Sequence, residues 1–294
     1  MAVMAALFCA ASGTAMADDS LSADLIEKSG ISEHLALVPT SIAQEAWSRL
    51  ELCQSEELVA LTETDEIQSD EANFTALVEK HFGLTTSRAR AIEAMNGNMN
   101  VKQRFSTKKF FDSDLGQRIV AAEEASKDVS EDEFVALAEE YFESSYWTDD
   151  RESLIRVVYE STNAARFVSI LNGELTVAVE VSSHCEPTLE NYQALGELLK
   201  TTRTDARLIE PIMANDLIFI IATTFRELTD RDLVEYLEFA RSDDGKAFYN
   251  ALLESTRRAI SGGLKGFRDE RIANYEQSLS AAKPANESTA EASD

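Results

Sequence analysis

The chain has 294 residues, of which 27 are Lys or Arg and 53 are Asp or Glu, so its formal net charge at pH 7 is -26. Nucleic acids and anionic lipid surfaces carry charge of the same sign, and the composition therefore argues against both as partners. The hydrophobic residues, 44% of the total, suffice for a core, whereas only 11 residues are glycine and 4 are proline, which favours helices over turns.

The first residues have the pattern of a secretory signal peptide. An apolar run begins at Met1 and leads to Ala-Met-Ala at 15–17, an A-x-A cleavage site directly before Asp18. We therefore expect residues 1–17 to be removed and the mature protein to be periplasmic or secreted. The alternative is a buried N-terminal helix. No later run approaches the roughly 20 apolar residues that cross a bilayer, so we expect no transmembrane segment.

Beyond the signal, apolar residues recur at intervals of three and four, which predicts an all-α protein built as a multi-helix array. The predicted helices are Ser20–Ser29, Thr40–Cys53, Glu71–Phe82, Thr86–Met95, Val101–Phe111, Asp114–Ser126, Ser130–Ser144, Asp149–Asn172, Thr188–Thr201, Asp205–Leu228, Asp230–Arg241 and Asp243–Ser261. Ser130 and Thr229 stand at the N-cap positions of two of them, each followed by an acidic residue that suits a capping box.

Two segments and the domain division need separate treatment. Residues 167–181 contain an Asn-Gly pair between β-branched runs, which fits a β-hairpin, but the same letters also form a helical stripe, and we favour the helix. Residues 278–294 are small and polar without periodicity, so we expect a disordered tail. The remainder, 18–277, is expected to form one helical domain or two packed, duplicated halves, 18–146 and 147–277.

One short pattern occurs twice in the chain, as FFDSDLG at 110–116 and FARSDDG at 239–245. The residues concerned are Phe110, Ser113 and Gly116 in the first copy and Phe239, Ser242 and Gly245 in the second. In each copy an aromatic residue ends a helix, Ser occupies the N-cap of the next helix, and Gly leaves room for the first helix to approach. The pattern therefore predicts two structural helix-to-helix corners.

At these corners the chain resembles a known family. The stretch FFDSDLGQRIVAAEEASKD is similar to the corner of the exported bacterial proteins of the domain of unknown function 2059 family, whose pattern is aromatic, x, Ser-Pro-x-Gly. The likeness extends loosely over 149–261, and Asp114 and Asp243 replace the common proline. The resemblance implies an all-helical periplasmic protein of Gram-negative bacteria that has no established activity.

Two carboxylates are candidates for a buried acid. Glu123 shares a helix face with Gly116, at a place where the second corner has Leu252. Glu123 could act as an acid-base group or as a ligand carboxylate, or it could form an ion pair with an arginine. We favour the ion pair. The arginines considered are Arg151, Arg156 and Arg166. Asp216 lies within IMANDLIFII, on the helix expected to be the most buried. Two such acids facing one pocket would form a metal or proton site.

The cysteine and histidine patterns limit which other kinds of site the chain could contain. Cys53 and Cys185 survive signal cleavage, and in an oxidising compartment we expect them to form a disulfide; the alternative is two buried thiols. No paired Cys or His spacing of a metal site occurs, and no P-loop, G-x-G-x-x-G or G-x-S-x-G motif is present. We therefore expect no metal and no cofactor, and favour a role without catalysis.

These observations favour a binding or protein-interaction module in envelope physiology, with an unidentified protein partner. One alternative is a carrier of a small apolar ligand held between the two corners. The aromatic residues that would line its site are Phe110, Phe111, Phe239, Phe248 and Tyr249. The other alternative is an enzyme of unrecognised type that uses Glu123 and Asp216.

Overall fold

The computed structural model describes residues 19–57 and 64–282, and within them no β-strand occurs, so the all-α prediction is confirmed. The helices are an N-terminal one at 19–28, α2 (Ile31–Glu57), α3 (Thr64–Phe82), α4 (Leu84–Asn98), α5 (Val101–Phe111), α6 (Asp114–Lys127), α7 (Glu131–Glu143), α8 (Asp149–Ser161), α9 (Ala164–Ser182), α10 (Leu189–Asp205), the short 3-10 helix η1 (Ala206–Ile209), α11 (Glu210–Thr224), α12 (Asp230–Arg241) and α13 (Asp243–Ala282). Within these ranges, no helix is long and apolar enough to cross a membrane.

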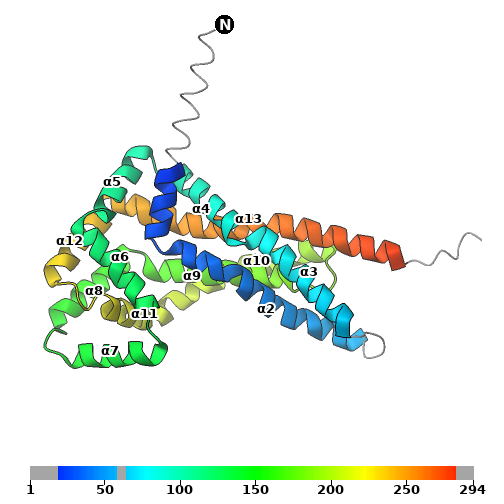
Figure 1. Cartoon of the computed structure of the whole chain (residues 1–294), viewed down its shortest axis with the longest axis horizontal. Coiled ribbons are helices and arrows are strands. Elements are labelled where there is room, and N and C mark those ends of the chain that lie inside the picture. Colours follow the sequence, from blue (N-terminus) through cyan, green and yellow to red (C-terminus); the bar gives the residue numbers. More distant parts are fainter. Residues whose placement is uncertain (1–18, 58–63, 283–294) are drawn as a thin grey trace, which may run out of the picture.

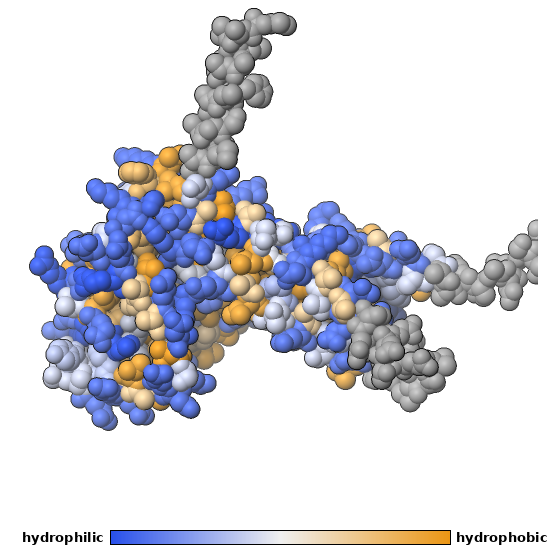
Figure 2. All heavy atoms as spheres, viewed as in Figure 1, coloured by the Kyte–Doolittle hydropathy of each residue, from blue (hydrophilic) through white to orange (hydrophobic). Residues whose placement is uncertain are grey.

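The last helix organises the array. Figure 1 shows α13 running along the long axis of the molecule, with α5 to α8, α11 and α12 gathered at one end and the tips of α2 and α3 at the other. Its 40 residues span about 60 Å at the α-helical rise, and it packs against α3, α4, α5 and α9. Hydrophilic residues cover most of the face seen in Figure 2.

α13 continues beyond its predicted end at Ser261, through a pair of glycines. A Cβ atom added to Gly263 would lie 2.6 Å from the backbone oxygen of His81, and one added to Gly262 would lie 2.7 Å from Cδ of Arg90. These glycines therefore allow α13 to approach α3 and α4 closely, instead of ending the helix. Residues 278–282 also belong to α13, in contrast to the predicted tail, and 283–294 lie outside the described residues.

Several other helix boundaries differ from prediction, and three of the differences change how the helices are arranged. α2 begins at Ile31 instead of Thr40 and contains Pro39, because its buried face continues through the proline with Val38 and Ile42. The helix predicted at 149–172 breaks at Asn163, whose φ is 56°, and 167–181 lies in the helix α9 that follows. The helix predicted at 205–228 is interrupted by η1 before α11.

The structure places a helix-to-helix corner at each copy of the repeated pattern. Ser113 Oγ accepts a hydrogen bond from the Gly116 amide at 3.2 Å and donates one to the Phe110 carbonyl at 2.6 Å. Ser242 makes the equivalent bonds in the second corner, at 3.0 and 2.7 Å. Each hydroxyl thus satisfies one free group of each helix that it joins.

The two corners pack against each other. The rings of Phe110 and Phe239 stack with centroids 3.8 Å apart and an interplanar angle of 4°. Arg118 of α6 donates two hydrogen bonds to Asp232 of α12, at 2.8 and 2.6 Å. The first helix of each corner also begins with a capping box, at Asn100 and at Thr229. A similar helix-corner-helix unit is therefore used twice, face to face.

The proposed division into duplicated halves, 18–146 and 147–277, remains a prediction. Helices from the two sides of residue 146 pack closely against one another, as α4 does with α13, α2 with α9, and α7 with α11. The helices of the two segments are thus interleaved in one array.

Candidate binding site

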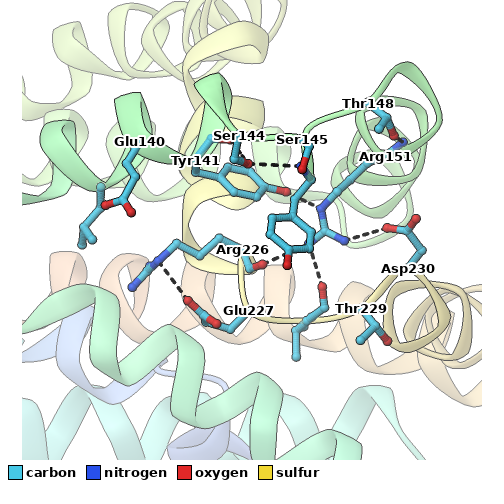
Figure 3. Close-up of a pocket in the computed structure, with 13 residues that line it drawn as sticks. Glu140, Tyr141, Ser144, Ser145, Thr148, Arg151, Arg226, Glu227, Thr229 and Asp230 are labelled. Carbon is cyan, nitrogen blue, oxygen red and sulfur yellow. Dashed lines mark hydrogen bonds and ion pairs between the residues drawn. The ribbon is translucent and has the colours of Figure 1, made fainter.

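A hollow of about 880 Å³ lies between the connection from α7 to α8 and the connection from α11 to α12. Figure 3 shows how side chains from both connections face it. It is lined by Leu137, Glu140, Tyr141, Ser144, Ser145, Tyr146, Thr148, Arg151, Arg226, Glu227, Leu228, Thr229 and Asp230.

Local hydrogen bonds fix the first of these connections. α7 ends before Ser144, whose hydroxyl donates to the Tyr141 carbonyl at 2.6 Å and accepts from the Tyr146 amide at 3.3 Å. α8 then begins at the N-cap Thr148, which accepts from the Arg151 amide at 3.2 Å. The short polar residues between the two helices are those that favour turns and caps, and they hold the side chain of Tyr146 at the surface.

Arg151 forms the floor of the hollow and is only 4% exposed. Its guanidinium donates to the Tyr141 hydroxyl, to Asp230 Oδ1 at 2.6 Å, and to carbonyl oxygens at the end of α11 and in the loop that follows. The bonds to the carbonyls of Phe225 and Leu228 measure 3.0 and 2.7 Å. One buried cation thus satisfies acceptors that the end of a helix leaves free and joins the two connections.

Aromatic side chains support the wall on the α7 side. Arg151 lies over the Tyr141 ring, with its Cζ 5.7 Å from the ring centroid. Burial raises the pKa of Tyr141, and the hydrogen bond from Arg151 opposes that effect. The Trp147 ring packs edge-on against Phe142 at 4.6 Å and against Tyr141 at 5.7 Å. This wall is therefore pre-organised by packing.

The rim of the hollow is negatively charged and carries an exposed aromatic ring. Tyr146 is 77% exposed, and Glu140 and Glu227 are also exposed. Among the described residues Glu140 makes no ion pair, whereas Glu227 lies 3.7 Å from the guanidinium of Arg226. Arg226 also donates to the Thr223 carbonyl at 3.0 Å. Asp230 neutralises Arg151 and Glu227 offsets Arg226, so the lining keeps a net negative charge from Glu140. Together with the exposed tyrosine, this negative rim suits a cation.

Glu123 lies on α6, outside the hollow, and the expectation of an arginine partner is wrong. Arg151 pairs with Asp230, and Glu123 makes no ion pair within the described residues. The side chain is half-buried, and burial, aided by Glu124, raises its pKa to about 7, although Lys127 opposes the shift.

The neighbours of Glu123 are two tyrosines instead. The hydroxyls of Tyr236 and Tyr249 are hydrogen-bonded to each other at 2.8 Å in the core. Burial raises the pKa of both, and the nearby carboxylate of Glu123 adds to the effect. Glu123 is thus coupled to a buried pair of neutral hydroxyls.

Asp216 is exposed, so the expectation of a buried carboxylate there is wrong. α11 is apolar around most of its circumference, yet Ile212 and Ile220 on the same helix are 76% and 45% exposed. Hydrophobic content alone therefore overstated the burial of this helix. The charged groups that shift the pKa of Glu123 are Lys127 and Glu124, not Asp216, so the two acids do not form a pair. Within the described residues no group of three or more His, Cys, Asp and Glu side chains could hold a metal ion.

The aromatic residues of the two corners pack against one another. Phe111 contacts Phe248 with centroids 5.3 Å apart, and Phe248 contacts Tyr249 at 5.1 Å, beside the stacked pair of Phe110 and Phe239. None of these five residues lines the hollow or any of four smaller cavities among residues 39–278. The rings thus serve the junction between the corners.

Cys185 lies just beyond α9 and is disulfide-bonded. Cys53 belongs to α2, but its side chain lies outside the described residues, so the pairing of the two remains a prediction. The surroundings agree with it, because Cys185 lines a cavity together with Trp47 and Leu50 of α2.

Sequence reasoning missed the hollow and its principal residues, Tyr141, Tyr146 and Arg151. They belong to the end of α7, the loop that follows and the start of α8, which become a site only when the distant α11–α12 connection packs beside them. The one signal in the sequence was Arg151 itself, an arginine on the same face of α8 as the apolar residues Ile155 and Val158, which are buried.

No protein-family model, no curated protein and no solved structure matches the chain. The resemblance of the corners to the domain of unknown function 2059 family therefore remains a prediction, as do the signal peptide and the cleavage site before Asp18, which lie outside the described residues.

Proposed function

We propose that the chain is an exported binding protein of the bacterial cell envelope that recognises a basic segment of a protein partner. The observation that carries this proposal is the hollow beside Tyr146, whose rim combines an exposed aromatic ring with the carboxylates of Glu140 and Glu227. The location rests on the signal-like N-terminus. Sequencing the N-terminus of protein isolated from the periplasm tests it: Asp18 is the expected first residue, and an intact Met1 contradicts export.

Three properties of the hollow support a basic ligand. Carboxylates attract Lys and Arg side chains, and a tyrosine face adds a cation-π contribution of about 0.5–1 kcal/mol at an exposed site. The floor is rigid, because Arg151 is held by Tyr141, Asp230 and backbone carbonyls, so little order has to be gained on binding. The net charge of -26 also accelerates encounters with a cationic partner.

Fluorescence of Trp147 provides a local readout, because it directly follows Tyr146 in the chain. Replacing the second tryptophan, Trp47→Phe, isolates that signal. The probe is a blocked pentapeptide with two arginines, and the comparison peptide has citrulline in place of arginine. We expect a saturable fluorescence change with the arginine peptide and a much weaker one with citrulline.

The variant Glu140→Gln/Glu227→Gln should weaken binding of the arginine peptide by at least about tenfold, because a hydrogen bond between charged groups is worth about 1.5–3 kcal/mol and about 1.4 kcal/mol corresponds to a factor of ten. The matched control is Glu190→Gln/Glu276→Gln, which removes the same charge at two other exposed positions. Equal weakening by both double variants would show that the whole acidic surface, and not the hollow, attracts the peptide. Equal binding of the citrulline peptide would also contradict the proposal.

A further inference from the structure

A second, smaller cavity of about 120 Å³ is surrounded by arginines, in a chain that is strongly acidic overall. Arg203 comes from the end of α10, Arg207 from η1 and Arg257 from α13. Segments far apart in the sequence thus bring three guanidinium groups to one small space. The cavity is distinct from the hollow beside Tyr146 and shares no lining residue with it.

The floor of this cavity is built from one face of α9, at Ser169, Gly173 and Glu174. The Ser169 hydroxyl donates to the carbonyl of Ala206 at 2.8 Å, which ties η1 to α9. A Cβ atom on Gly173 would lie 2.9 Å from that of Ala206, so glycine is what allows η1 to sit this close. The position of Arg207, the next residue, is therefore set by backbone packing.

The carboxylates nearby do not balance the three positive charges. Glu174 is 3% exposed and receives two hydrogen bonds from Arg203, at 2.9 and 2.8 Å. Arg257 lies 3.9 Å from the same carboxylate and is paired at 2.6 Å with Glu254, which does not line the cavity. Within the described residues Arg207 makes no ion pair. The lining thus keeps an excess of positive charge.

We infer that this cavity binds a phosphate-type oxyanion. Arginine forks match the oxygen geometry of phosphate, and the positive charge that remains after Arg203 and Arg257 are paired with carboxylates is available to an anion in the cavity. The cavity is too small for a drug-sized ligand, whose sites occupy about 300–1,000 Å³. It suits either free phosphate or a terminal phosphate group whose remaining atoms extend into solvent past Arg207, which is exposed.

Thermal unfolding tests this inference, because a ligand that binds only the folded state raises the melting temperature in proportion to the logarithm of its concentration. The probes are inorganic phosphate and glycerol 3-phosphate, compared with sodium chloride of the same ionic strength. Both probes should raise the melting temperature if the mouth admits a phosphate ester. A shift with inorganic phosphate alone would show that the site takes only the free ion.

Three variants separate binding from general screening. Arg207→Gln should weaken phosphate binding about tenfold, because it removes a charge-assisted contact. Glu174→Gln should strengthen binding, since it removes the one negative charge in the lining. Arg231→Gln, at an exposed arginine of α12 outside the cavity, should leave binding unchanged. A phosphate effect no larger than that of chloride, or one reduced equally by Arg207→Gln and Arg231→Gln, would overturn the inference.

Discussion

Replacing Gly245 by alanine should destabilise the protein by about 1–2 kcal/mol, although alanine is the better helix former. A Cβ atom at this position would lie 2.0 Å from the carbonyl oxygen of Phe239, 2.8 Å from its carbonyl carbon and 3.0 Å from Cα of Ala240. All three contacts are backbone atoms at the end of α12, so no side chain can rotate away. The two helices of the corner have to move apart by more than 1 Å to reach an ordinary separation of 3.4–4 Å.

The magnitude follows from two opposing effects. Overpacking a well-packed contact costs typically about 1–3 kcal/mol and more when backbone has to shift. The gain in helix propensity from glycine to alanine is about 0.5–1 kcal/mol. Separation of the helices also stretches the 3.0 Å hydrogen bond from the Gly245 amide to Ser242 and disturbs the stacked Phe239 ring. The steric cost therefore exceeds the gain in propensity.

Urea unfolding followed by circular dichroism at 222 nm measures the difference. The matched control is Gly196→Ala in α10, where no atom lies within 4 Å of an added Cβ, and where we expect a small stabilisation. Gly116→Ala should behave like Gly245→Ala, since its Cβ would lie 2.2 Å from the Phe110 carbonyl oxygen. Midpoints of Gly245→Ala and Gly196→Ala that agree within error would refute the close approach of the helices at the corner.

Burial raises the pKa of Glu123 from 4.5 to about 7. Between these pH values the folded protein keeps a proton on Glu123 that the unfolded protein releases. The free energy of unfolding therefore falls as the pH rises from 4.5 to about 7. Because the side chain is partly exposed, we expect Glu123→Gln to be about 1–2 kcal/mol more stable than the parent in urea at pH 8 and equally stable at pH 4; a constant difference would contradict the titration. For Asp232 the pH dependence runs the other way, because the hydrogen bonds from Arg118 lower the pKa of its carboxyl group. Asp232→Asn should therefore reduce the free energy of unfolding by about 1–2 kcal/mol at pH 7 and by less as the pH falls below 3.8, and urea unfolding at pH 7 and below pH 3.8 measures the difference. Thiol titration of the unfolded, unreduced mature protein should find no reactive group at Cys53 or Cys185, and two thiols per chain would rule out the predicted bond.

The sequence allowed the corners to be located because their determinants are local. A serine at the N-cap and a glycine in the first turn act within a few residues of each other, and α5 was predicted with its observed bounds, Val101–Phe111. The helical state of α9 also followed from periodicity, since the predicted helical stripe includes Ala178 and Ser182, which are both buried.

Features that depend on distant segments could not be predicted. The last helix was predicted to end at Ser261, directly before Gly262 and Gly263. The structure instead uses the absence of side chains at these glycines for close packing against α3 and α4, whose positions the local sequence does not encode. Arg151 was one of three arginines considered as a partner of Glu123, whereas the end of α11 offers it several acceptors. The hollow is likewise assembled from two distant segments and the arginine-lined cavity from three, and nothing in any one segment marks a site.

The length and position of α13 have a consequence for the order in which the fold forms. Its most extensive contact among the described residues is with α4, which was made about 150 residues earlier in the chain, and it also covers α3 and α5. The parts of these early helices that α13 covers therefore stay exposed until the C-terminal segment is present. Such long-range closure slows folding, because the entropy of a large loop is lost before the contacts form. When the chain emerges N-terminus first, from a ribosome or through a membrane pore, its hydrophobic core therefore stays incomplete until α13 has emerged.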